Sequence, residues 1–366
     1  ERIRLLAGSY GPERVPARPD RDDADWYLPL HLRDEAAARA RIAAQVIAGA
    51  DVVVAPTWRT HRRALLPLGE TRRAAEWTAT AVRVARDGAE IGLEQRQEAL
   101  ADVPDDDVRH DRPTPLVAAS LPALDEEDEQ ETGRLLPQEA ATERDYRDQA
   151  GYLADAEPDV LLIEGQRTEA ATRLAITEAA QTGLPVWAAL TRAALASTPA
   201  ESWLEWGSGP TVGRFLLPAP LEDHLSVADA GGDWGAYLSD PAEISRWLQA
   251  GAGTIACLDG ASRDRLRPYR EAIDEHERSA LEAARVASRR WQATVARAAA
   301  MAPGGAALWI GERPLLPLPD GFRWTRVDAR QVVQLPRAPS RLVVLEDDAA
   351  PDAAGLLERD AIMALR

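Results

Sequence analysis

The sequence contains no lysine and no asparagine, and its 366 residues include a single cysteine, Cys257. One cysteine excludes an internal disulfide framework, and it excludes zinc sites of the Cys₄ or Cys₃His type. Without lysine, the chain has no Schiff-base nucleophile and no lysine that could act as a general base. Apart from five histidines, every basic side chain is an arginine.

Long apolar runs and an excess of basic charge are also missing. No apolar run approaches the roughly 20 residues of a membrane-spanning helix, and no signal-peptide pattern is visible. The net charge is -17 and the pI is about 4.9. Nucleic acids and anionic membranes require a clustered basic face, so neither is an expected partner. We therefore expect a cytoplasmic protein whose partner is a small molecule.

Eight short apolar runs alternate with amphipathic helical stretches. Continuous apolar runs are typical of parallel strands that are buried on both faces. Eight such units predict an α/β protein with a (β/α)₈ barrel, and an open doubly wound sheet is the alternative. Strands are expected at 3–8, 51–56, 115–120, 159–164, 185–190, 212–218, 234–238 and 254–257. Helices are expected at 33–48, 70–87, 138–155, 167–182, 194–204, 219–230, 241–250 and 262–300.

The pattern changes towards the end of the chain. APGGAALWIGERP, GFRWTRVD and SRLVVLEDD predict three further short strands, and a final helix is expected near 351–365. We therefore predict two domains, a barrel over 1–300 and a small α/β extension over 301–366. Residues 92–114 are polar, acidic and contain proline, which predicts a flexible excursion. The Arg- and Ala-rich helix over 271–300 indicates a contact for a homodimer.

The reactive groups of a (β/α)₈ barrel lie at the carboxyl ends of its strands. Glu164 ends a strongly apolar strand, where a carboxylate needs an ammonium, an arginine or a hydrogen-bond donor. Asp259 follows the last barrel strand and provides a second carboxylate. Both are candidate catalytic residues. The candidate substrate-binding residues at the same end are Glu164, Thr57, Trp58, Tyr10 and Tyr237.

A metal site and a serine hydrolase are the alternatives at this end of the barrel. His61, His224, Cys257 and Asp259 carry suitable donor atoms, but no local spacing motif joins them. No G-x-S-x-G elbow of a serine hydrolase is present. We expect no metal and no cofactor, and we interpret Cys257 as a small apolar residue inside the barrel wall.

Six segments resemble the homocysteine S-methyltransferase family, whose members are (β/α)₈ barrels that use a zinc-bound homocysteine thiolate as nucleophile. The resemblance covers about residues 3–280, and it rests on the order and barrel spacing of the six segments together. The segments are LLAGSYG (5–11), VIAGADVVVAPTWRTH (46–61), LVAAS (116–120), AEPDVLLIEG (156–165), TGLPVWAALT (182–191) and QAGAGTIACLDGASRDRLRPYREAI (249–273).

This sequence departs from the family pattern at the residues that bind zinc and substrate in the family. The family's cysteine pair after the eighth strand corresponds to Leu258 and Asp259, and its third zinc cysteine is absent from 214–220. The aspartate that helps to hold the substrate ammonium corresponds to Ala7, whereas the family's glutamate is present as Glu164. Zinc lowers the pKa of a bound thiol, so that it attacks as a thiolate, and three soft ligands complete its shell. The sequence therefore predicts that this zinc site is lost.

These residues predict a diverged, zinc-free methyl or one-carbon transferase, or a barrel that binds a small metabolite. Glu164 would bind a cationic amino acid or a sulfonium, and Asp259 would act as a general base or as a charge partner. One alternative is a catalytically inactive binding or interaction module that has lost its zinc site. Another is a hydrolase or lyase that uses the Glu164 and Asp259 pair.

Overall fold

The computed structural model consists of two compact units, Glu1–Glu277 and Arg278–Arg366, which are described separately below. The residues that the structure describes are 2–7, 30–66, 68–101, 103–104, 107, 109–110, 112–124, 139–197, 212–220, 233–257, 262–301, 306–310, 323–326 and 341–345.

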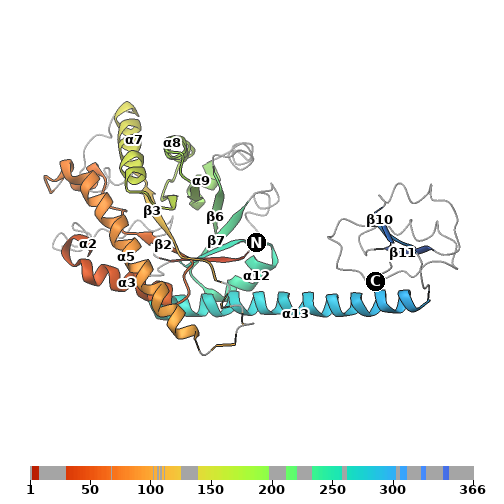
Figure 1. Ribbon diagram of the computed structural model, residues 1–366. Helices are drawn as coiled ribbons and strands as arrows, with labels where there is room; N and C mark the ends of the chain where they lie inside the picture. The colour runs from red at the N-terminus through yellow and green to blue at the C-terminus, as the bar shows by residue number, and fades with distance from the viewer. Residues whose placement is uncertain are drawn as a thin grey trace. The chain divides into compact units, whose positions relative to one another are not determined.

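The first unit is a closed barrel of eight parallel strands in chain order, with helices on its outside (Figure 1). The barrel closes where β1 pairs with β8, with Leu5 opposite Ile255. The predicted (β/α)₈ barrel is confirmed, and the open doubly wound sheet is wrong. Its strands are β1 (Arg4–Ala7), β2 (Val52–Ala55), β3 (Leu116–Pro122), β4 (Val160–Glu164), β5 (Val186–Ala189), β6 (Arg214–Pro218), β7 (Trp234–Leu238) and β8 (Thr254–Cys257).

Local capping starts several of the helices. Asp34 Oδ1 accepts a hydrogen bond from Ala37 N at 2.9 Å, and Thr168 caps α8 in the same way by accepting from Ala171 N. Such side chains satisfy amide groups that have no partner in the first helical turn. The helices are α2 (Leu30–Arg33), α3 (Glu35–Ile47), α4 (Arg62–Leu65), α5 (Ala74–Leu100), α7 (Glu139–Asp155), α8 (Glu169–Ala180), α9 (Arg192–Ser197), α12 (Ile244–Gln249) and α13 (Arg263–Met301), with 3₁₀ turns η1 (Thr71–Arg73) and η3 (Pro241–Glu243).

Alternate residues of each strand serve two different cores. One cluster consists of strand residues alone and fills the barrel interior, with Leu162, Trp187 and Tyr237 as its largest members. The other cluster joins the outer faces of the strands to the helices, as Ile163 and Cys257 do. Side chains alternate between the two faces of a strand, so the register of each strand decides which core receives each residue.

Helix α5 is longer than the sequence pattern predicts. The flexible excursion expected over 92–114 is wrong over 92–100, because α5 continues to Leu100. A Cβ at Gly88 would lie 2.7 Å from Ile42 Cβ, and one at Gly92 would lie 2.7 Å from Val46 Cβ. These two glycines let α5 approach α3 closely, and this packing extends the helix through a polar stretch.

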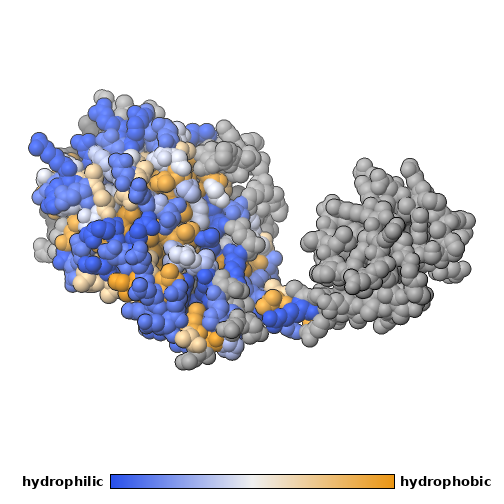
Figure 2. Space-filling model, viewed as in Figure 1, coloured by the Kyte–Doolittle hydropathy of each residue, from blue (hydrophilic) through white to orange (hydrophobic). Residues whose placement is uncertain are grey.

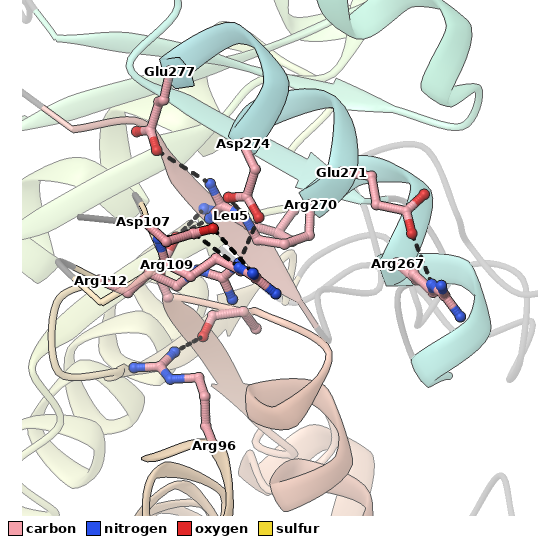
Figure 3. Close-up of polar contacts among 12 residues, drawn as sticks. Leu5, Arg96, Asp107, Arg109, Arg112, Arg267, Arg270, Glu271, Asp274 and Glu277 are labelled. Atoms are coloured by element: carbon pink, nitrogen blue, oxygen red, sulfur yellow. Dashed lines mark hydrogen bonds and ion pairs between the residues drawn. The ribbon is translucent and has the colours of Figure 1, made fainter. Parts of the chain in front are cut away.

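A buried ion network lies at the amino ends of the barrel strands (Figure 3). Asp51, which precedes β2, accepts at Oδ2 from Leu5 N and from Arg270 Nη1, each at 2.9 Å. Arg112 Nη2 donates to Asp274 Oδ2 at 2.6 Å, and Arg270 Nε lies 2.7 Å from Asp274 Oδ1. The network ties the first turns of α13 to β1 and β2, so it supports the end of the barrel opposite to the candidate site.

The second unit contains a three-stranded parallel sheet in the order β10-β9-β11. Its strands are β9 (Ala306–Ile310), β10 (Arg323–Arg326) and β11 (Arg341–Leu345), which confirms the three strands predicted here. The predicted helix near 351–365 and residues 221–230 of another predicted helix lie outside the described residues. Helix α13 crosses the boundary between the two units, and the domain boundary at residue 300 stays a prediction.

The visible face of the barrel unit is mainly hydrophilic (Figure 2). Among the described residues, the large apolar side chains that are exposed are Leu66, Leu68, Ile91 and Leu281. None of the helices described is both long enough and apolar enough to cross a membrane.

Candidate functional site

Glu164, the last residue of β4, is a fully buried carboxylic acid at the carboxyl end of the barrel. Ser120 Oγ on the adjacent strand β3 donates a hydrogen bond to Glu164 Oε1 at 2.5 Å. Ser120 is paired with Leu162, so Ser120 and Glu164 lie on the same face of neighbouring strands. A buried carboxylate loses its hydration, and donors such as this hydroxyl offset part of that loss.

Thr57 holds the backbone of Ser120. Its Oγ1 donates to Ser120 O at 3.0 Å and accepts from Ser120 N at 2.8 Å. The backbone pairing of β2 with β3 ends at Ala55 and Ala119, so the threonine side chain continues the ladder beyond the last strand residue. Thr57 therefore fixes the strand position from which Ser120 reaches Glu164.

Trp58 packs against the residue that follows Glu164. Its indole is buried, and a Cβ added at Gly165 would lie 2.9 Å from Trp58 Cη2. Gly165 has a φ of 94°, in the left-handed region that glycine adopts at little cost. The absence of a side chain at residue 165 makes room for the indole, which forms an aromatic wall next to the β4 end.

Tyr237 lies in the interior of the barrel, where it is buried and belongs to the same cluster as Leu162 and Trp187. Tyr10 and Asp259 lie outside the described residues, so the structure does not place them. Of the predicted site residues that are described, Glu164, Thr57 and Trp58 meet at the ends of β2, β3 and β4.

His61 is buried and serves as the cap of α4. Its Nδ1 accepts a hydrogen bond from Ala64 N at 3.3 Å. Burial, together with the positive charges of Arg59 and Arg63, lowers the pKa of His61 to about 3. The imidazole is therefore neutral at ordinary pH, and its Nδ1 is engaged in a structural bond.

Cys257 ends β8 and contributes to the outer core, between the strands and the helices. Tyr269 from α13 belongs to the same cluster and donates to Leu238 O at 2.8 Å. Burial raises the pKa of Tyr269, and the adjacent Cys257 adds to the shift. The predicted apolar role of Cys257 in the barrel wall agrees with this position.

The described residues do not fit the zinc ion that the family resemblance implies. Within this part of the chain, no group of three or more His, Cys, Asp or Glu residues could hold a metal ion. Cys257 faces the helices, and the end of β6 presents Leu217 and Pro218. His224 and Asp259 from the alternative metal set lie outside the described residues.

The sequence patterns predict no role for Ser120, Thr60, Thr78 or Gln149, but a chain of hydrogen bonds in the structure joins these residues, through Thr57, to Glu164. Ser120 carried a signal, because it is a polar residue in an otherwise apolar strand. Thr78 and Gln149 gave no signal in the sequence, because threonine and glutamine on amphipathic helices usually face solvent.

Comparisons with known proteins agree with the resemblance predicted from the six segments. The family model described as homocysteine S-methyltransferase matches residues 33–209. The metallated form of the homocysteine methyltransferase MmuM from Escherichia coli matches with a TM-score of 0.55 and 16% identity, covering 74% of this chain and 96% of that chain. Its oxidized form matches with a TM-score of 0.55 and 17% identity, covering 74% of this chain and 95% of that chain. At these identities, the likeness to the solved structures shows the fold. No curated protein sequence matches this chain.

Proposed function

We propose that the barrel of this chain is a member of the homocysteine S-methyltransferase family, whose model matches residues 33–209, that it binds a small cationic metabolite at Glu164, and that it transfers a methyl or other one-carbon group without zinc. The observation that carries the proposal is the buried Glu164 carboxyl group, held by Ser120 at the carboxyl end of β4. An anion that is kept out of water attracts a cation far more strongly than an exposed one.

The surroundings of Glu164 favour an alkylated cation. Trp58 places an aromatic ring next to the β4 end, and aromatic faces attract ammonium and sulfonium groups. A sulfonium methyl donor also contains its own leaving group. The acceptor's lone pair forms the new bond to the methyl carbon, the carbon–sulfur bond breaks, and its electron pair stays on sulfur as a neutral thioether. Asp259 is the proposed base for any proton that the acceptor loses.

The zinc-free part of the proposal rests on where Cys257 lies. Zinc would supply a thiolate nucleophile at neutral pH, and it needs several soft ligands at the strand ends. Cys257 is instead buried in the outer core, near Tyr269. The acceptor in this barrel is therefore proposed to be a group that is nucleophilic without a metal.

Calorimetry with S-methyl-L-methionine, a sulfonium amino acid, tests the proposal, with L-methionine as the ligand that lacks the sulfonium charge. We expect the sulfonium to bind more tightly, and Glu164→Gln to weaken its binding at least about tenfold through the lost charge. Glu178→Gln is the matched control, because Glu178 is a buried glutamate of α8 that pairs with Arg147. Equal binding by the wild type and Glu164→Gln would contradict the proposal.

A second assay separates a transferase from the inactive binding module. Mass spectrometry would follow transfer of the labelled methyl group from S-methyl-L-methionine to L-homocysteine, as the family acceptor, and to a panel of amine and hydroxyl acceptors. Transfer that Glu164→Gln abolishes supports the transferase. Tight binding with no labelled product from any acceptor would identify the barrel as a binding module.

A further inference from the structure

Three polar side chains form a closed cluster between the barrel and its helices. Thr60 follows β2, Thr78 lies on α5 and Gln149 lies on α7, and all three are buried. Thr60 Oγ1 and Thr78 Oγ1 are 2.8 Å apart. Gln149 Nε2 donates to both hydroxyl oxygens at 3.4 Å.

The hydrogen bonds in this cluster have a defined direction. Thr60 Oγ1 donates to Thr57 O at 3.0 Å, which uses its one hydroxyl proton. Thr78 must therefore donate the bond between the two hydroxyls, since each hydroxyl has a single proton. Every donor in the cluster thus points from the helices towards Thr57.

The chain of bonds continues from Thr57 to the candidate site. Thr57 Oγ1 is bonded to both backbone groups of Ser120, and Ser120 Oγ donates to Glu164 Oε1 at 2.5 Å. We propose that Thr60, Thr78 and Gln149 are positioning residues, which fix the Glu164 carboxyl group through Thr57 and Ser120.

Fold stability alone does not account for this cluster. Gln149 Oε1 is buried and has no hydrogen-bond partner among the described residues. An unpaired buried acceptor costs free energy, whereas an apolar side chain of similar shape at the same position avoids that cost. A leucine at residue 149 would therefore keep the fold at least as stable. What it would remove is the pair of amide bonds to Thr60 and Thr78.

Hydrogen exchange of the Ser120 amide, measured by NMR on the full chain, tests the proposal. The amide of Leu161, which donates to Pro185 O at 2.8 Å just before β5, provides the internal reference. We expect Thr60→Val and Gln149→Leu to speed Ser120 exchange about two- to tenfold relative to Leu161, the range expected for one lost hydrogen bond. Thr60→Ser retains the hydroxyl and should restore the wild-type ratio.

Thr172→Val is the matched control, because Thr172 is a buried threonine whose hydroxyl donates to Thr168 O at 2.8 Å within α8. This variant should leave the ratio of Ser120 to Leu161 exchange unchanged. An unchanged ratio in both Thr60→Val and Gln149→Leu would overturn the proposal, as would an equal rise in Thr172→Val. If Thr60→Val does not fold, Gln149→Leu decides the question alone.

The value of this positioning for binding rests on the proposed function of Glu164, but the exchange measurement needs no ligand. An exchange result as expected, together with no sulfonium binding, would contradict the proposed function and leave the positioning role intact. Sulfonium binding together with an unchanged exchange ratio would support the proposed function and contradict the positioning role.

Discussion

Gly49 leaves the space that the aliphatic stem of Arg270 occupies. A Cβ at Gly49 would lie 2.5 Å from both Cγ and Cδ of Arg270, and Gly49 has a φ of 104°. The turn before β2 and the first turns of α13 are therefore built to fit each other. Arg270 reaches Asp51 only because residue 49 has no side chain.

Gly49→Ala should destabilise the barrel for both of these reasons. The left-handed backbone costs about 1–3 kcal/mol for a residue other than glycine, and the new methyl group would push Arg270 away from Asp51. Urea unfolding followed by circular dichroism measures the loss. Gly183→Ala is the control, because Gly183 also has a positive φ, of 75°, but an added Cβ would meet no atom within 4 Å. A loss no larger than that of the control would show that Arg270 can move aside at no cost.

Arg270→Ala should be one of the most destabilising substitutions in the chain. It leaves the buried Asp51 without its cation, and breaking a buried pair in this way costs about 3–5 kcal/mol. The control is Arg267→Ala, at a position three residues before Arg270 on α13. This change removes an exposed ion pair with Glu271 and should leave the free energy of unfolding unchanged (Figure 3). Similar urea midpoints for the two variants would contradict a supporting role for the network.

The stability of the barrel should fall as the pH is lowered from about 6.5 towards 4. Burial lowers the pKa of His61 to about 3 and that of His31 to about 4, each from an ordinary value of 6.5. The unfolded chain therefore binds more protons than the folded chain in this window. Each histidine then contributes a loss of up to about 1.4 kcal/mol per pH unit, and the contribution is fully present above pH 6.5.

Urea unfolding at pH 7.5 and pH 5.0 checks this dependence. His61→Asn keeps a side-chain acceptor at the cap of α4 and removes the titrating group, so it should lose about 2 kcal/mol less than the wild type. His110→Asn is the control, because His110 is an exposed histidine. An identical pH dependence for the wild type and His61→Asn would mean that His61 is not responsible.

The purified protein should contain no stoichiometric zinc. The described residues provide no group of three metal-binding side chains, and Cys257 packs in the outer core. Elemental analysis of protein prepared without a histidine tag, before and after incubation with zinc, measures the content. About one zinc per chain, lost in Cys257→Ser, would show that the end of β8 is rearranged and would restore thiolate chemistry to the proposal.

Much of the barrel follows from sequence patterns alone. Runs such as DVLLIE are apolar throughout, and a strand of this kind must be buried on both faces. Eight of them separated by amphipathic helices can bury their surfaces together by closing into a barrel. Glu164 was predictable for the same reason, because a carboxylic acid at the end of such a strand lies at the carboxyl end of the barrel, where reactive groups are found.

The tertiary structure decided which side chains meet. Helix α5 continues through a polar stretch because Gly88 and Gly92 fit against α3, a contact between segments far apart in the chain. Ser120 meets Glu164, and Cys257 faces the helices, because strand register assigns each residue to one of two faces. A shift of one residue would exchange those faces, and register depends on all eight strands closing together. The sequence by itself therefore determined the kind of fold and the end of the barrel that carries the candidate site. The partners of Glu164 depend on distances that only the closed barrel sets.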